Sequence, residues 1–189
     1  VRFMKNYDIS KIRNVSLLGH RGSGKTTLIE SLLYISKAIA KMGTVENGST
    51  VSDYDKEEIK RDFSINTSLI PVEYNGMKYN FLDTPGYLDF FGEVQSSVRV
   101  SGSSVIVLDA TAGIEAGAER AWRILEENFQ PRIIFLNKMD KGFINYERLL
   151  LELKDKFGKK IAPFCIPIGE KEEFKGFINV VEMKTRIFN

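Results

Sequence analysis

The sequence predicts an α/β fold in three layers, with helices on both faces of a mainly parallel sheet and one antiparallel hairpin at its edge. Three observations support this. Short apolar segments alternate with segments in which apolar residues recur at helical spacing. Asn75-Gly76 separates two strand-like segments, as in a tight hairpin. Three polar motifs each follow an apolar strand-like segment, and ligands of parallel sheets bind at such strand ends.

The first third of the chain predicts a strand, a glycine-rich loop, a helix and a long loop. Ile12–Leu18 is the strand, and Gly19 ends it. The helix after the loop has an apolar face made of Leu28, Leu32, Ile35 and Ile39. Residues 37–66 have no apolar periodicity and contain glycines and a charged run, so we expect a mobile functional loop there, disordered over 41–62 without its ligand.

The middle of the chain predicts the hairpin. Ser68–Tyr74 and Met77–Asp83 flank Asn75-Gly76, which suits a type I′ turn. Pro71 lacks an amide hydrogen, so the first of these strands is expected at the sheet edge.

The remaining elements alternate between strand and helix. Two continuous apolar segments, Val105–Leu108 and Ile133–Leu136, predict strands that are covered on both faces. Ala116–Asn128 predicts the helix between them, and Asn145 can cap a further helix. Ile161–Ile166 is a candidate for one more strand.

Composition excludes several classes of protein. The 189 residues suffice for one domain, or for one domain and part of another. No apolar run approaches the length of a membrane span, and no signal pattern is present, so we expect a monomeric cytoplasmic chain with no membrane partner. The single cysteine, Cys165, excludes an intrachain disulfide and a cysteine-rich zinc cluster, and predicts a buried thiol. A net charge of +2 is too small to argue for nucleic acid.

The first motif, GHRGSGKT at Gly19–Thr26, predicts a phosphate site. Its glycines let successive backbone N–H groups turn toward phosphate oxygens, and the following helix adds its positive N-terminal end. Lys25 would reach the β- and γ-phosphates, and the Thr26 hydroxyl would bind Mg²⁺. His20 is expected to be an exposed loop residue. The strand before the loop and the amphipathic helix after it favour phosphate binding over an ordinary glycine turn.

The second motif, DTPG at Asp83–Gly86, predicts a sensor of the terminal phosphate and its metal. Asp83 ends an apolar strand, which would place a carboxylate beside the metal. Gly86 can offer an unobstructed N–H to a γ-phosphate and permit a loop with two states. Taken alone, this motif is equally consistent with an ordinary turn after a strand.

The third motif, NKMD at Asn137–Asp140, predicts a guanine site. A carboxylate accepts two hydrogen bonds from guanine that adenine cannot supply. Lys138 can lay its methylene stem over the purine, and Asn137 can tie the loops together. The three motifs together predict a P-loop NTPase that binds GTP or GDP with Mg²⁺. The guanine motif argues against an ATPase, and the intact phosphate loop argues against a structural domain with degenerate loops.

The chain resembles, over nearly its whole length, the N-terminal GTP-binding domain of translation elongation factor G and its relatives, including the tetracycline-resistance ribosomal protection proteins. DTPGYLDF at Asp83–Phe90 is similar to the family's DTPGHVDF, and RDFSIN at Arg61–Asn66 to its RGITI segment. Segments at Pro167–Glu170, Phe174–Gly176 and Met183-Lys184 resemble the opening of the family's insertion subdomain. The resemblance implies a ribosome-dependent GTPase, with rRNA and ribosomal proteins as partners and stimulation in trans, since no arginine finger is evident.

The resemblance also implies a division of the chain. Residues 1–158 would form the GTP-binding domain, and residues 159–189 would begin the insertion subdomain. The family's base-supporting Ser-Ala loop and the last strand and helix of its nucleotide domain would follow Asn189, so we expect a piece of a longer factor with a truncated domain.

Three positions depart from the family's pattern. Tyr87 replaces a histidine that orients the attacking water in the family; a phenol can hydrogen-bond to water but carries no positive charge, so we expect slower or differently activated hydrolysis. Ser64 matches the family's metal-binding threonine, and Asp62 the glycine beside that segment's arginine. These changes indicate a divergent paralogue. The alternative function is a poorly hydrolysing, GTP-dependent ribosome-binding module, active in ribosome protection or recycling.

The predicted site residues form three groups. The catalytic residues are expected to be Lys25, Gly86 and Tyr87. The residues expected to bind nucleotide are Gly19, His20, Arg21, Gly22, Ser23, Gly24, Lys25, Thr26, Thr27, Asp83, Gly86, Asn137, Lys138 and Asp140. The residues expected to hold Mg²⁺ are Thr26, Ser64 and Asp83.

Overall fold

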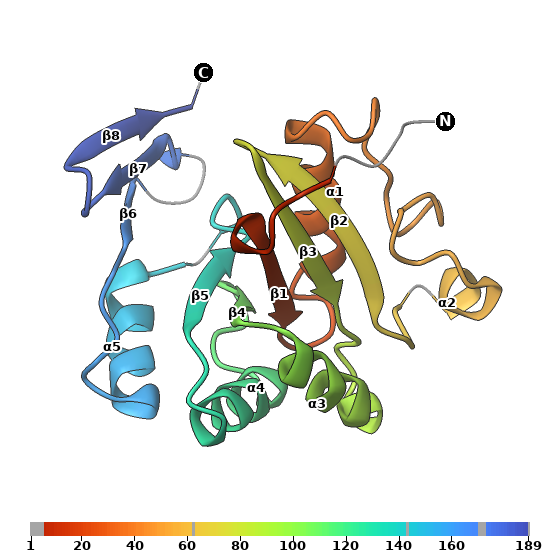
Figure 1. Ribbon diagram of the computed structural model, residues 1–189. Helices are drawn as coiled ribbons and strands as arrows, with labels where there is room; N and C mark the ends of the chain where they lie inside the picture. The colour runs from red at the N-terminus through yellow and green to blue at the C-terminus, as the bar shows by residue number, and fades with distance from the viewer. Residues whose placement is uncertain (1–5, 62, 143, 170–172, 189) are drawn as a thin grey trace. The chain divides into compact units, whose positions relative to one another are not determined.

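The structure, a computed structural model, describes residues 6–61, 63–142, 144–169 and 173–188 (Figure 1). The chain forms two compact units. The first comprises Val1–Val107 and Ala116–Phe135, and the second comprises Leu108–Glu115 and Leu136–Asn189. Within the described ranges, no helix is both long enough and apolar enough to cross a bilayer.

A five-stranded sheet with the order β2-β3-β1-β4-β5 lies mostly in the first unit, and the last residues of β4 and β5 belong to the second. A short 3-10 turn, η1 (Ile9–Lys11), leads into the central strand β1 (Ile12–Leu18). This strand runs parallel to β3 (Met77–Asp83) and to β4 (Ser103–Asp109). The edge strands are β2 (Ser68–Tyr74), which is antiparallel to β3, and β5 (Arg132–Asn137). The predicted mainly parallel sheet with an antiparallel edge hairpin is therefore confirmed.

The hairpin turn has the predicted backbone. Asn75 and Gly76 have φ angles of 47° and 75°, and a type I′ turn requires positive φ at both positions. Pro71 lies on the edge strand β2, as its missing amide hydrogen predicts.

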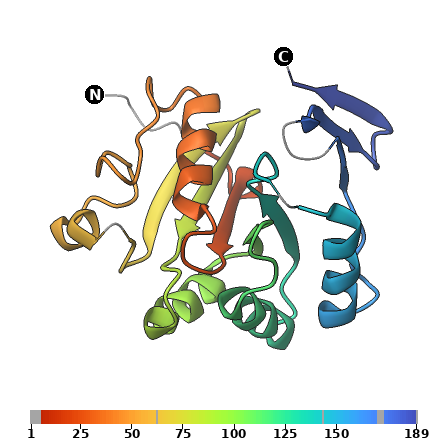
Figure 2. The same ribbon diagram turned by 180° about the vertical axis from the view of Figure 1, so that it is seen from behind.

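Helices cover both faces of this sheet, which completes the three layers (Figures 1 and 2). α1 (Lys25–Ile35) lies on one face, while α3 (Phe91–Val100) and α4 (Ala116–Glu127) lie on the other; η2 (Leu88–Phe90) precedes α3. The core on the α1 side is built from the buried side chains of Leu17, Ile29, Leu33, Ile70, Val72 and Val107.

The predicted apolar face of α1 is wrong in part. The buried positions of the helix are Lys25, Ile29 and Leu33, together with Glu30. The glycine-rich loop holds Lys25 inward, and this turns the helix so that residues four and eight positions later face the sheet. Ile35, predicted to be inward, is 66% exposed.

The two apolar strands differ in how they are covered. β4 is buried as predicted, with Ile106, Val107 and Leu108 at most 1% exposed. The prediction is wrong for β5, where Ile133 and Phe135 are 65% and 39% exposed. An edge strand can contain an apolar run without being covered on both faces. The apolar run alone therefore did not distinguish the buried strand β4 from the edge strand β5.

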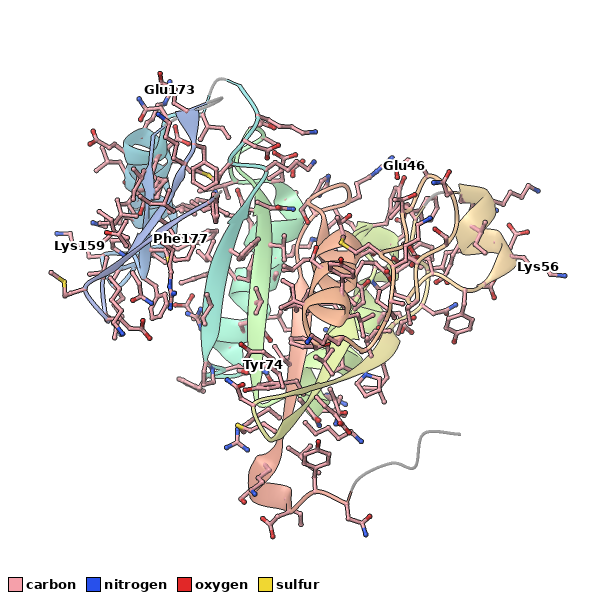
Figure 3. All side chains as sticks on the ribbon, turned by 90° about the horizontal axis from the view of Figure 1, so that it is seen from above. Glu46, Lys56, Tyr74, Lys159, Glu173 and Phe177 are labelled. Carbon is pink, nitrogen blue, oxygen red and sulfur yellow. The ribbon has the colours of Figure 1, made fainter. Side chains whose placement is uncertain are left out.

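In the described part of residues 37–66 the structure has one regular element that the sequence did not predict, the helix α2 (Lys56–Arg61). Figure 3 shows the side chain of Lys56 pointing away from the sheet. Asp62, part of the expected switch segment, lies outside the described residues.

The second unit combines one helix with a small antiparallel sheet. α5 (Tyr146–Phe157) begins as predicted, with Asn145 Oδ1 accepting a 2.8 Å hydrogen bond from the Arg148 amide. The sheet has the order β6-β7-β8, formed by Cys165–Ile168, Gly176–Asn179 and Lys184–Ile187. The strand predicted at 161–166 therefore begins later, and the Cys165 thiol, predicted to be buried, is only partly buried.

Candidate functional site

The loop between β1 and α1 is a tight turn closed by a lysine. Three of its residues, Gly19, Gly22 and Gly24, have φ angles of 144°, 74° and 94°. A Cβ on Gly19 would lie 2.3 Å from a backbone oxygen of β4, so no larger residue fits. Lys25 is 6% exposed, and its Nζ donates hydrogen bonds to the carbonyls of Gly19 (3.0 Å) and His20 (2.9 Å). The loop therefore encloses a fixed positive charge.

His20 is not the exposed loop residue that the sequence predicted. It is partly buried, because the start of α4 lies against the loop. A Cβ on Gly117 would come within 2.7 Å of the His20 Cα, so this contact also requires glycine. Of the other loop residues, Ser23 is buried, whereas Arg21 and Gly22 are exposed, as is Thr27 on α1.

Asp83 is brought beside the start of α1 by the sheet register. It pairs with Leu17 near the end of β1, so both strands end at the same edge. Thr26 Oγ1 donates a 2.9 Å hydrogen bond to Asp83 Oδ2. Asp83 is 1% exposed, and burial raises the pKa of its carboxyl to about 6, although the Lys25 ammonium and the Thr26 hydrogen bond lower it.

Thr26 and Asp83 fit the chemistry of a magnesium site. Mg²⁺ prefers oxygen ligands and usually combines one or two protein ligands with phosphate oxygens and water. Asp83 Oδ1 is buried and has no hydrogen-bond partner among the residues described, so it is an oxygen that a cation can satisfy. In the described part of the chain, no group of three or more His, Cys, Asp or Glu residues could hold a metal by itself.

Ser64, expected to be a metal ligand, forms a hydrogen bond with a carboxylate instead. Its Oγ donates a 2.7 Å hydrogen bond to Asp53 Oδ1. Asp53 is 6% exposed, and burial raises the pKa of its carboxyl, while the Ser64 hydrogen bond and Lys25 lower it and Glu58 raises it. Sequence reasoning missed Asp53, because it lies in the charged run for which the sequence predicts only a mobile functional loop.

Two further buried carboxylates hold the segment around Asp53, and sequence reasoning missed both. Glu30 on α1 is fully buried and accepts the amides of Gly43 (2.9 Å) and Val51 (2.6 Å), one on each oxygen. Glu58 Oε1 accepts the amides of Ile65 (2.9 Å) and Asn66 (3.0 Å). The one available signal for the burial of Glu30 was its position next to Ile29 on the helix.

The DTPG turn is anchored to β1 and lies against the glycine-rich loop. Thr84 Oγ1 donates a 2.6 Å hydrogen bond to the carbonyl of Leu17. A Cβ on Gly86 would lie 2.6 Å from the Arg21 amide nitrogen and 2.8 Å from Lys25 Nζ. Only glycine fits at this position, and its backbone lies next to the ammonium group.

Tyr87 contacts residues from two other segments. Its ring centroid lies 4.5 Å from the guanidinium carbon of Arg21 and 4.4 Å from the ring centroid of Phe63. The first contact has cation–π geometry. The residue expected to act on water is therefore fixed by a loop arginine and by an aromatic residue next to Ser64.

The NKMD segment lies in the second unit. Lys138 has a φ of 60°, and its Nζ forms a 2.5 Å ion pair with Asp109 Oδ2. Burial tends to raise the pKa of Asp109, but hydrogen bonds from Lys138 and Thr111 outweigh it and lower the pKa. The Asn137 carbonyl accepts the Ala110 amide at 3.0 Å, and the Asp140 carboxylate is exposed. The sequence did not predict the role of Asp109.

Comparison with known proteins identifies the family to which the chain belongs. The family described as "Elongation factor Tu GTP binding domain" matches residues 10–186. Elongation factor G from Dehalococcoides mccartyi strain CBDB1 is 38% identical over 180 residues, which cover 95% of this chain and 26% of that protein. Elongation factor G from Mycoplasma genitalium is 36% identical over 98% of this chain and 27% of its own length.

Two further similarities extend the comparison. The mitochondrial ribosome-releasing factor 2 of Pongo abelii is 37% identical over 97% of this chain and 24% of that protein. A crystal structure of a protein from Thermus thermophilus superposes with a TM-score of 0.89 at 37% identity, and the match covers 95% of this chain and 27% of the other. The chain therefore spans about a quarter of the length of these proteins.

Proposed function

This chain belongs to the family of elongation factor Tu GTP binding domains, and from that premise we propose that it hydrolyses GTP with Mg²⁺ as part of a ribosome-associated factor similar to elongation factor G. One observation carries the proposal. Lys25 from the first motif meets Asp83 and Gly86 from the second, two motifs far apart in the sequence, at one edge of the sheet around a buried ammonium group.

Each of these residues has a part in the proposed reaction. The Lys25 ammonium neutralises charge that develops on the β- and γ-phosphates, and the Gly86 amide donates to the γ-phosphate. Thr26 and Asp83 would hold Mg²⁺, with Ser64 as a further ligand, and the metal supplies positive charge to the phosphate oxygens when bound. Tyr87 orients the attacking water through its hydroxyl group.

Guanine specificity is proposed to reside in the second unit. The Asp140 carboxylate accepts two hydrogen bonds from the guanine edge, and an adenine in its place would leave that carboxylate unsatisfied. The ion pair with Asp109 fixes the head of Lys138, which leaves its methylene stem available to the base.

Residues 159–189 are proposed to begin the insertion subdomain of the family. Their three strands form a sheet of their own, which supports this interpretation. The proposed partner is the ribosome, with its RNA and proteins, and the name of one relative, ribosome-releasing factor 2, supports this.

A second function, a GTP-dependent ribosome-binding module that hydrolyses poorly, is favoured by one observation. Tyr87 replaces the family's histidine, and contacts with Arg21 and Phe63 hold its ring. Such a ring is restricted in its approach to water.

Single-turnover hydrolysis separates the two functions. The protein is loaded with radiolabelled GTP, and phosphate release is followed with and without ribosomes, with Lys25→Ala as the inactive control. Acceleration by ribosomes supports the GTPase. GTP-dependent ribosome binding without acceleration supports the binding module and contradicts the GTPase.

A further inference from the structure

Arg21 lies in the glycine-rich loop, and the proposed function gives its side chain no specific role. Its backbone lies against Gly86, because a Cβ on that glycine would come within 2.6 Å of the Arg21 amide nitrogen and 2.7 Å of its Cα. The same Cβ would lie 2.8 Å from Lys25 Nζ. The Arg21 side chain therefore begins close to the Lys25 ammonium group and to Gly86, whose amide is proposed to donate to the γ-phosphate.

The Arg21 side chain is exposed but has a fixed contact. Its guanidinium carbon lies 4.5 Å from the centroid of the Tyr87 ring. Tyr87 in turn contacts Phe63 at 4.4 Å between ring centroids. Among the residues that the structure describes, no carboxylate forms an ion pair with Arg21. The guanidinium is thus oriented by an aromatic face and keeps its charge and donors available.

Tyr87 supplies no positive charge at the reacting phosphate, and Arg21 can supply it. A phenol can donate a hydrogen bond to water but brings no positive charge to the reacting phosphate. A guanidinium is always charged and presents donors in a planar fork that matches phosphate oxygens. An arginine that reaches the transferring phosphoryl group is among the strongest accelerators of GTP hydrolysis.

We propose that Arg21 supplies, from within the same chain, the positive charge for GTP hydrolysis, and that Tyr87 is the positioning residue that holds its guanidinium. In the reaction, a water oxygen forms a bond to the γ-phosphorus while the bond to the β–γ bridging oxygen breaks, and that electron pair leaves with GDP. The water proton passes to the released phosphate, and Arg21 neither gains nor loses a proton. This inference rests on the proposed GTPase function.

Binding of a transition-state analogue tests Arg21 separately from turnover. The affinity for fluorescent GDP is measured in Mg²⁺ with and without aluminium fluoride, which mimics the transferring phosphoryl group beside GDP. The unaltered protein should bind GDP more tightly with aluminium fluoride. Arg21→Ala should lose at least about tenfold of the aluminium fluoride gain, with the gain measured against the variant's own affinity for GDP.

Two substitutions of Tyr87 separate its ring from its hydroxyl. Tyr87→Phe keeps the aromatic face and should lose less of the gain than Tyr87→Leu, which should lose it to the same extent as Arg21→Ala. The double variant Arg21→Ala/Tyr87→Leu should be no worse than either single variant, since both remove one interaction. Arg120→Ala is the matched control, because Arg120 is also exposed and lies over an aromatic ring, that of Phe91, at 5.6 Å.

The outcomes distinguish this inference from the proposed function. An unaltered protein that hydrolyses GTP and gains from aluminium fluoride, with Arg21→Ala equal to it, overturns the role of Arg21 alone. Loss of the gain in Tyr87→Phe but not in Arg21→Ala overturns it as well and assigns the effect to the hydroxyl. An unaltered protein that binds GDP with no gain and no hydrolysis overturns both proposals.

Discussion

Ser64 donates a 2.7 Å hydrogen bond to Asp53, although its place in the sequence predicts a metal ligand. Both residues lie in the segment between α1 and β2, and the raised pKa of Asp53 reflects its burial there. If Ser64 turns to the metal when nucleotide binds, it exchanges this carboxylate for Mg²⁺.

This exchange predicts different effects for two substitutions. Ser64→Ala should raise the Mg²⁺ concentration for half-maximal GTP hydrolysis about tenfold, because it removes a ligand. Asp53→Asn should change that concentration by no more than about twofold, because the amide oxygen still accepts the hydroxyl and the metal ligands remain. A magnesium titration of hydrolysis measures both. Equal shifts in the two variants would show that Ser64 acts only through Asp53.

Glu30 should contribute to stability through the two amides that it accepts. Glu30→Gln directs an amide N–H₂ at one of the backbone N–H groups of Gly43 and Val51, and should lower the free energy of unfolding by about 1–3 kcal/mol. Urea unfolding measures this. Glu57→Gln is the control, since its 3.2 Å ion pair with Arg61 is exposed and should change stability by less than about 0.5 kcal/mol. Equal effects of the two changes would exclude a structural role for Glu30.

Ionisation of the Asp83 carboxyl should lower the free energy of unfolding of the metal-free protein as the pH rises. Its pKa is raised from 3.8 to about 6 in the folded chain, so the folded state holds a proton that the unfolded state has released. The stabilisation is complete below about pH 3.8 and is lost as the pH rises through about 6. A shift of this size corresponds to about 3 kcal/mol.

Asp83→Asn removes this dependence. The difference in unfolding free energy between the variant and the unaltered protein, measured by urea unfolding in EDTA, should change in favour of the variant by up to about 3 kcal/mol between pH 4 and pH 7. Because the other titrating groups are shared, the difference isolates Asp83. Parallel stability curves for the two proteins would show that the Asp83 carboxyl titrates as it does in the unfolded chain.

Gly86 should tolerate no side chain. In Gly86→Ala the new Cβ would displace the Arg21 backbone or Lys25 Nζ, from which it would lie 2.6 and 2.8 Å. A displacement of about 1 Å at a reacting group costs about 100-fold in rate, so GTP hydrolysis should fall by that order. Gly92→Ala is the matched control, because a Cβ there meets nothing within 4 Å. A Gly86→Ala protein as active as Gly92→Ala would contradict the proposed placement of the terminal phosphate.

The elements that the sequence predicted well are those with strong local signals. Asn75-Gly76 defines its own turn type, Asn145 caps its own helix, and glycines stand at the positions of the first loop that have positive φ angles. The bounds of β1, β2 and β3 agree with the predicted ranges residue for residue. In each case the determining interaction lies within a few residues.

The features that the sequence did not predict depend on distant contacts. In the sequence, Glu30, Asp53 and Glu58 look like ordinary surface charges. In the structure they are buried, because backbone amides or a hydroxyl from other segments donate hydrogen bonds to their carboxylates. The contact of Arg21 with Tyr87 joins residues far apart in the chain. No periodicity or motif records such pairings, so they emerge only in the folded structure.

The most direct test of the central claim is a calorimetric titration of the protein with GTP, GDP and ATP in Mg²⁺, repeated with Lys25→Ala and Asp140→Ala. The proposed site predicts that GTP and GDP bind and ATP does not. It also predicts that Lys25→Ala weakens the affinity for GTP and that Asp140→Ala removes the preference for guanine. Equal affinity for ATP and GTP, or guanine binding that neither substitution weakens, would contradict the assignment of the phosphate and guanine sites.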